Sequence, residues 1–128
     1  MTRAEPVNAP DAPAPSGGYA QAVRLSDFGE LVFVSGQIPV GADGGVPESF
    51  SEQCRLVWRN LEAQLRAAGM GLGDIVKLTT FLADRAHADE NSAIRREILG
   101  GRAPALTVII AGIYDERWLL EIELVAAR

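Results

Sequence analysis

The sequence predicts a single α+β domain, in which two helices cover one face of a mixed β-sheet. The chain has 128 residues, which is the length of one domain with a core of its own. Five runs rich in branched and aromatic residues are typical of strands, and two amphipathic segments are typical of helices. Their order is strand, strand, helix, strand, helix, strand, strand.

The N-terminal segment is expected to lie outside this domain. Residues 1–16 are rich in Pro and Ala, which excludes a regular helix and predicts a flexible, extended arm, with the domain spanning residues 17–128. Two strand-like runs follow, YAQAVRL (19–25) and ELVFVSGQIPV (30–40). The turn residues SDFGE between them predict that they pair as a hairpin.

The clearest helix covers residues 49–69. Ser49 followed by Glu52 resembles a capping box, and Gly69 ends the pattern. Apolar residues recur at helical spacing along one side of this segment, which predicts that this side packs on the sheet. They are Cys54, Val57, Leu61, Leu65 and Ala68.

The second half of the chain alternates strand and helix before ending in two strands. Residues 74–84 predict a strand, residues 85–101 a weaker helix, and residues 103–113 and 117–127 the last strands. In the last strand Glu121, Glu123 and Val125 share one face by the period of two. The sheet face without helices would also carry large apolar residues. We therefore expect a second copy of the chain to cover it, most simply in a closed homo-oligomer.

Composition excludes several classes of protein. The net charge of −5 lacks the basic surface that nucleic-acid binding needs, so nucleic acid is an unlikely partner. No apolar stretch is long enough to span a membrane, and the N-terminus does not resemble a secretory signal, so a cytoplasmic location is expected. With one cysteine, Cys54, and one histidine, His87, the chain offers neither an internal disulfide nor a metal-ligand cluster.

Five segments, in this order and at these spacings, resemble the Rid (YjgF) family. They are SGGYAQAV, VFVSGQIPV, GDIVKLTTFLAD, RAPALTV and LLEIELVA. The resemblance implies a chorismate-mutase-like α+β fold, assembled as a barrel-shaped homotrimer with small-molecule pockets at the subunit interfaces. It also implies kinship with imine and enamine deaminases, which hydrolyse reactive intermediates to keto acids and ammonia. That reaction requires no metal or organic cofactor.

The resemblance also assigns site residues. Tyr19, Ser35 and Asn91 fall on positions that shape the family's pocket, and Glu121 falls on the glutamate that holds the attacking water. Leu106 stands where the family has the arginine that grips the substrate carboxylate. The chain therefore resembles the members that lack this arginine.

The leucine argues against ordinary 2-imino-acid hydrolysis, because it removes a charge-assisted hydrogen bond worth about 1.5 to 3 kcal/mol. A less acidic or neutral ligand is expected instead. Arg102, four residues earlier, is the nearest residue that could replace the missing arginine.

Simpler interpretations stay open for these residues. Leu106 by itself is typical of a core strand, Glu121 could pair with an arginine of a neighbouring subunit, and Asn91 could be an ordinary helix residue. Three functions stay open in the same way. They are a hydrolase of imines or enamines that uses Glu121, a trimer that binds a metabolite without turnover, and an endoribonuclease, against which the acidic composition counts.

Overall fold

The computed structural model describes residues 2–128 and contains two sheets, two α-helices and two short 3₁₀ helices. The strands are β1 (Arg3–Val7), β2 (Ala22–Ser26), β3 (Leu31–Gln37), β4 (Ile75–Leu82), β5 (Ala105–Ile110) and β6 (Leu120–Ala127). The helices are α1 (Phe50–Ala67), η1 (Leu72–Asp74), η2 (Arg85–His87) and α2 (Ala88–Leu99).

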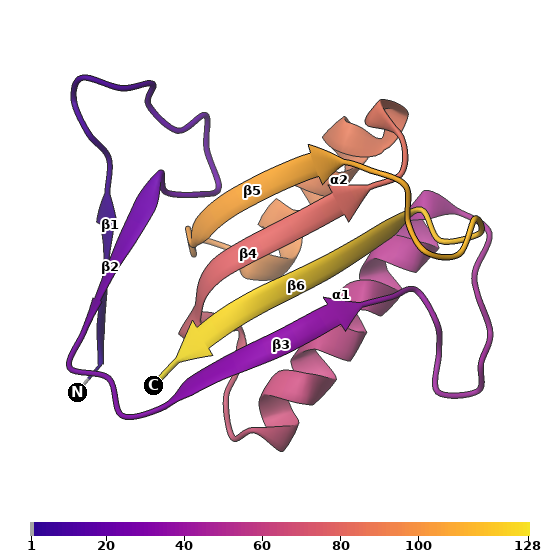
Figure 1. Cartoon of the computed structure of the whole chain (residues 1–128), viewed down its shortest axis with the longest axis horizontal. Helices are drawn as coiled ribbons and strands as arrows, with labels where there is room; N and C mark the ends of the chain where they lie inside the picture. Colours follow the sequence, from indigo (N-terminus) through magenta and orange to yellow (C-terminus); the bar gives the residue numbers. More distant parts are fainter. Residues whose placement is uncertain (1) are drawn as a thin grey trace.

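The main sheet has the strand order β3-β6-β4-β5. The pairs β3–β6 and β6–β4 are antiparallel, whereas β4–β5 is parallel and is connected through α2. A parallel pair needs such a crossover, because a tight turn can join only antiparallel neighbours. Both helices lie on one face of this sheet (Figure 1). The predicted α+β architecture is confirmed.

The core lies between this sheet and α1. Ser49 caps α1 as predicted, since its side chain accepts a hydrogen bond from the backbone N–H of Glu52 at 3.1 Å. The apolar side of α1 meets alternate residues of β4 and β6. The fully buried side chains include Cys54, Val57, Leu61, Leu65, Leu78, Leu82, Leu120 and Ile122.

The predicted hairpin between residues 19–25 and 30–40 is wrong. Strand β2 pairs with β1, which lies inside the expected arm, and β3 pairs with β6 instead. The prolines that exclude a helix still permit a strand with an unpaired edge, and Pro6 lies in β1. The two-stranded β1–β2 ribbon stands beside one end of the main sheet (Figure 1). A hydrogen bond from the N–H of Ala20 to the carbonyl of Pro104, 3.0 Å, joins the segment before β2 to the residue before β5.

The sheet face opposite the helices carries exposed apolar side chains. Phe33 on β3 is 73% exposed, and Leu31 and Ile109 are also exposed. Phe81 of β4 is paired with both Ile109 and Glu121, and paired residues point to the same face of a sheet. The expected uncovered apolar face is therefore present in the single chain, and Glu121 lies on it.

Candidate functional site

The carboxylate of Glu121 lies directly against Gly36 of the neighbouring strand β3. A Cβ atom added to Gly36 would overlap Oε2 of Glu121 and would lie 2.8 Å from its Cδ and 3.0 Å from its Cγ. Any residue other than glycine at position 36 would therefore displace this carboxylate. Glu121 is half-buried in this position.

Ser35 precedes Gly36 in the sequence, and β3 bulges at these two residues. Val34 is paired with Leu124 and Gln37 with Ile122, so β3 has one more residue than β6 across this interval. A bulge of this kind bends the strand and redirects its side chains. Ser35 is exposed, and its carbonyl accepts a hydrogen bond from the Gln37 side chain at 3.0 Å. The motif SGQ thus has a hydroxyl at position 35 and room for the Glu121 carboxylate at position 36.

Tyr19 and Leu106 lie together at a different place, in a cavity of about 320 Å³ between α2, β5 and the loop before β2. We call this the α2–β5 cavity; the residues that line it include Ser16, Tyr19, Ser92, Arg95, Arg96 and Leu106. Oη of Tyr19 lies 3.4 Å from Oγ of Ser16 and accepts a hydrogen bond from the Ser16 backbone N–H at 3.2 Å. The side-chain and backbone hydrogen bonds to Ser16 lower the pKa of Tyr19.

Asn91 does not line this cavity. It is 2% exposed, and its Oδ1 lies 4.0 Å from Sγ of Cys54 on α1. The side chain is therefore packed between the two helices, as a core residue would be.

Arg102 does not line the α2–β5 cavity either. Its Nη1 donates a hydrogen bond to the carbonyl of Leu99 at 3.0 Å, at the end of α2. The guanidinium lies close to Gly73, in a separate cavity beside β1. In the single chain, Arg102 thus supports the end of a helix and lies apart from Leu106.

Sequence reasoning missed Arg95, which lines the α2–β5 cavity. Arg95 is 3% exposed, and within residues 2–128 its Nε has no hydrogen-bond partner. Burial lowers the pKa of Arg95, and the positive charge of Arg96 acts in the same direction. A signal was available, since Arg95 follows Asn91 by four residues and so lies on the same side of α2.

Leu106 and Glu121 lie on opposite faces of the sheet. Leu106 is paired with Leu78, which points toward the helices, whereas Glu121 is paired with Phe81 on the open face. The six predicted residues therefore separate. Ser35 and Glu121 form one group, Tyr19 and Leu106 a second, and Asn91 and Arg102 join neither.

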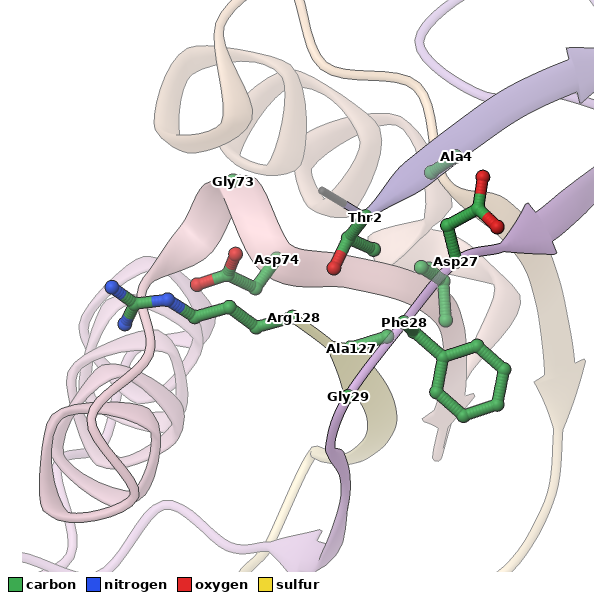
Figure 2. A pocket seen from close by; sticks show the side chains of 10 residues that line it. Thr2, Ala4, Asp27, Phe28, Gly29, Gly73, Asp74, Ala127 and Arg128 are labelled. Carbon is green, nitrogen blue, oxygen red and sulfur yellow. The ribbon is translucent and has the colours of Figure 1, made fainter.

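A larger cavity, of about 790 Å³, holds none of the predicted residues. Figure 2 shows Asp74 and Arg128 on one side of it and Asp27 and Phe28 on the other. Its charged groups already have partners: Arg128 donates to the carbonyl of Gly69, Asp74 accepts from the N–H of Gly71, and Asp27 pairs with Arg3. Volume alone does not make this cavity a reactive site.

Among residues 2–128, no group of three or more His, Cys, Asp or Glu side chains could hold a metal ion. His87 stacks on Phe50, with 4.5 Å between the ring centroids. In the same described part of the chain, no helix is both long and apolar enough to cross a bilayer.

Comparison with known proteins adds to this geometry. The model of the family Endoribonuclease L-PSP matches residues 9–128. A RutC family protein of Pyrococcus horikoshii is 33% identical over 118 residues, which cover 91% of each chain. A protein of Salmonella typhimurium named 2-iminobutanoate/2-iminopropanoate deaminase is 47% identical over 75 residues, 58% of this chain and 56% of the relative.

The fold is shared with solved structures too. A Rid family protein of unknown function, YyfB from Yersinia pestis, matches with a TM-score of 0.84 at 26% identity, over 98% of both chains. The sequence match and the shared fold cover the same four-stranded sheet and both helices. The chain therefore belongs to the Endoribonuclease L-PSP family, which is the Rid (YjgF) family.

Proposed function

We propose that this protein hydrolyses a small imine or enamine in a site formed where two copies of the chain meet. The observation that carries the proposal is the half-buried carboxylate of Glu121, held against Gly36 on a sheet face that no helix covers. The name of the Salmonella relative, an iminobutanoate and iminopropanoate deaminase, supports the same class of reaction.

The separation of the two residue groups supports a shared site. Ser35 and Glu121 are on the open face, and Tyr19 and Leu106 are on the helix side, so one copy cannot bring them around one ligand. A second copy that covers the open face could do so. The exposed Phe33 gives that face an apolar surface to bury, and a closed trimer is the arrangement that the family resemblance implies.

The chemistry needs one group that handles water. The carboxylate of Glu121 accepts a proton from a water molecule while the oxygen of that water attacks the imine carbon. Glu121 returns this proton to the nitrogen of the carbinolamine that forms from the protonated imine. The C–N bond then breaks while the hydroxyl proton passes to Glu121, and a carbonyl compound and ammonia leave. An enamine enters the same route after it is protonated at carbon. Ser35 lies where it could donate a hydrogen bond to the reacting group.

Leu106 sets the expected substrate range. It offers no hydrogen bond to a carboxylate, and the loss of a charge-assisted bond of about 1.5 to 3 kcal/mol corresponds to roughly 10- to 150-fold. We therefore expect 2-iminopropionate to react that much more slowly than with a relative that has arginine at this position.

The test uses imines generated in place by an amino-acid oxidase, from alanine and from leucine, with ammonia release measured above the spontaneous rate. The wild-type protein should accelerate the release from at least one of them, and Glu121→Gln should abolish the acceleration. No acceleration by the wild type, or equal acceleration by Glu121→Gln, would refute the proposed role. Release from 2-iminopropionate as fast as with an arginine-bearing relative would refute the role given to Leu106.

The same preparations test the assembly. Phe33→Glu should lower the molar mass measured by light scattering, because it places a charge on the apolar face. An unchanged mass would mean that this face is not the contact between copies.

The family's name also raises RNA cleavage as a second function. The net charge of −5 counts against it, because RNA binding depends on basic surface. Cutting of a single-stranded RNA by highly purified wild-type protein, lost at high salt and lost in Glu121→Gln, would favour the nuclease over the deaminase.

A further inference from the structure

The α2–β5 cavity contains a buried positive charge that the structure does not balance. We propose that Arg95 binds an anionic group of a small molecule in this cavity, and so provides from helix α2 the charge that Leu106 does not provide from strand β5. The inference rests on the proposed function, in which this cavity and the open sheet face of a second copy together form the substrate site.

The first support is the state of the Arg95 side chain. Arg95 is 3% exposed, and in the described part of the chain its Nε donates to nothing. A buried guanidinium N–H without an acceptor is costly, because it has lost its hydration and gained no hydrogen bond. A ligand in the adjacent cavity could supply the missing acceptor and so offset this cost.

The second support is the charge around it. Arg96 lines the same cavity, and the residues that line it include no Asp or Glu. The acid nearest in sequence, Glu97, is already paired with Arg55 across to α1, with 2.5 Å between Nη1 and Oε2. Two arginines and no carboxylate among the lining residues give the cavity a positive charge.

The third support is the shape of the lining. A planar guanidinium can hold a carboxylate or a phosphate through two parallel hydrogen bonds. Tyr19 and Ser92 add hydroxyl groups beside it, whereas Leu106 and Val108 form an apolar wall. The volume of about 320 Å³ admits a molecule of a few heavy atoms. The site is thus suited to a small anion whose uncharged part contacts Leu106.

This assignment revises the expectation of a neutral ligand. It is also compatible with the slow turnover of 2-iminopropionate that we expect. If a residue of α2 binds the substrate carboxylate, the adjacent imine carbon lies in a different place than if a residue of β5 binds it. The reaction rate depends on the position of that carbon.

The experiment is a calorimetric titration of the full-length protein with pyruvate, with inorganic phosphate and with pyruvamide, the neutral counterpart of pyruvate. The variants are Arg95→Met, which keeps most of the side-chain volume without the charge, and Arg95→Lys, which keeps the charge without the planar fork. Arg102→Met is the matched control, since that guanidinium lies in a different cavity. Light scattering and thermal unfolding establish that each variant is folded and has the wild-type mass.

We expect pyruvate or phosphate to bind the wild type and Arg102→Met equally. Arg95→Met should weaken that binding by about 10- to 100-fold, with an intermediate loss in Arg95→Lys. Pyruvamide should bind the wild type and Arg95→Met alike. Tighter binding of pyruvate than of phosphate would identify the anion as a carboxylate, and the reverse would identify it as a phosphate.

Two results would overturn the inference. One is that neither anion binds the wild type, or that both bind Arg95→Met as well as the wild type. The other is that Arg95→Met and Glu121→Gln both lower the molar mass, which would show that Arg95 pairs with a carboxylate of a second copy.

The outcome is separable from that of the proposed function. Anion binding that depends on Arg95, in a protein without deaminase activity, would refute only the proposed reaction. Activity without such binding would refute only the role of Arg95.

Discussion

Gly36→Ala tests how closely the activity depends on the position of one carboxylate. The added methyl group would overlap Oε2 of Glu121 and approach its Cδ to 2.8 Å and its Cγ to 3.0 Å. Ordinary contacts begin near 3.4 Å, so the carboxylate must leave its place against β3. A displacement of about 1 Å in a reacting group costs roughly 100-fold in rate, and we expect that loss in kcat.

The same change should leave the fold intact. Gly36 is not among the glycines with positive φ, so alanine fits its backbone, and the overlap is with the end of a flexible side chain. Replacing glycine by alanine at such a site commonly raises stability by about 0.4 to 1 kcal/mol, and the overlap reduces that gain. We expect the free energy of unfolding in urea to stay within about 1 kcal/mol of the wild type.

The assay is ammonia release from the imine that the wild type hydrolyses fastest, together with urea unfolding. Gly71→Ala is the matched control, because a Cβ there meets nothing within 4 Å. In the background of Glu121→Gln, Gly36→Ala should cost no further activity, since both act on one carboxylate. Activity of Gly36→Ala within threefold of the wild type would refute the reasoning.

Three further predictions follow from other parts of the chain. Gln53→Leu should destabilise the fold by about 3 kcal/mol or more in urea unfolding. The reason is that the buried side chain of Gln53 donates to two backbone carbonyls and accepts from the N–H of Leu119. A loss of less than about 1 kcal/mol would contradict this prediction. Burial raises the pKa of Cys54 to about 12, so a thiol reagent at pH 8 should label Cys54 only after the protein unfolds. Labelling of the folded protein within minutes would contradict this prediction. Hydrogen bonds from Arg117 lower the pKa of Asp115 to about 2 from 3.8. Asp115→Asn should therefore lower the free energy of unfolding by its full amount above pH 4, and this difference from the wild type should shrink as the pH falls toward 2. A difference that does not change with pH would argue against the pairing.

The elements of the main sheet and both helices could be predicted because their signals are local. The apolar spacing of α1 and its cap at Ser49 are encoded within a few residues, and so is the alternation that puts Glu121 on one face of β6. The partner of β2 could not be predicted in this way. Either β1 or β3 can pair with it, and the choice depends on contacts between distant segments.

The candidate site shows the same division. Family resemblance pointed to Glu121, and the structure adds that Gly36 makes room for its carboxylate. The resemblance also grouped Asn91 with the pocket, whereas the side chain is packed against Cys54. Arg95 matches no motif, because its significance depends on its burial and on the lack of a hydrogen-bond partner for its Nε within residues 2–128.

The sequence by itself determined the family and the α+β class, since each is a property of residue order along the chain. Only the tertiary structure decided that Leu106 and Glu121 lie on opposite faces of the sheet, that Arg102 supports the end of α2, and that Arg95 lines the same cavity as Leu106. The physical reason is that these facts concern which side chains share a space. Spacing along one element cannot specify that, because it depends on how strands pair and on which face the helices cover.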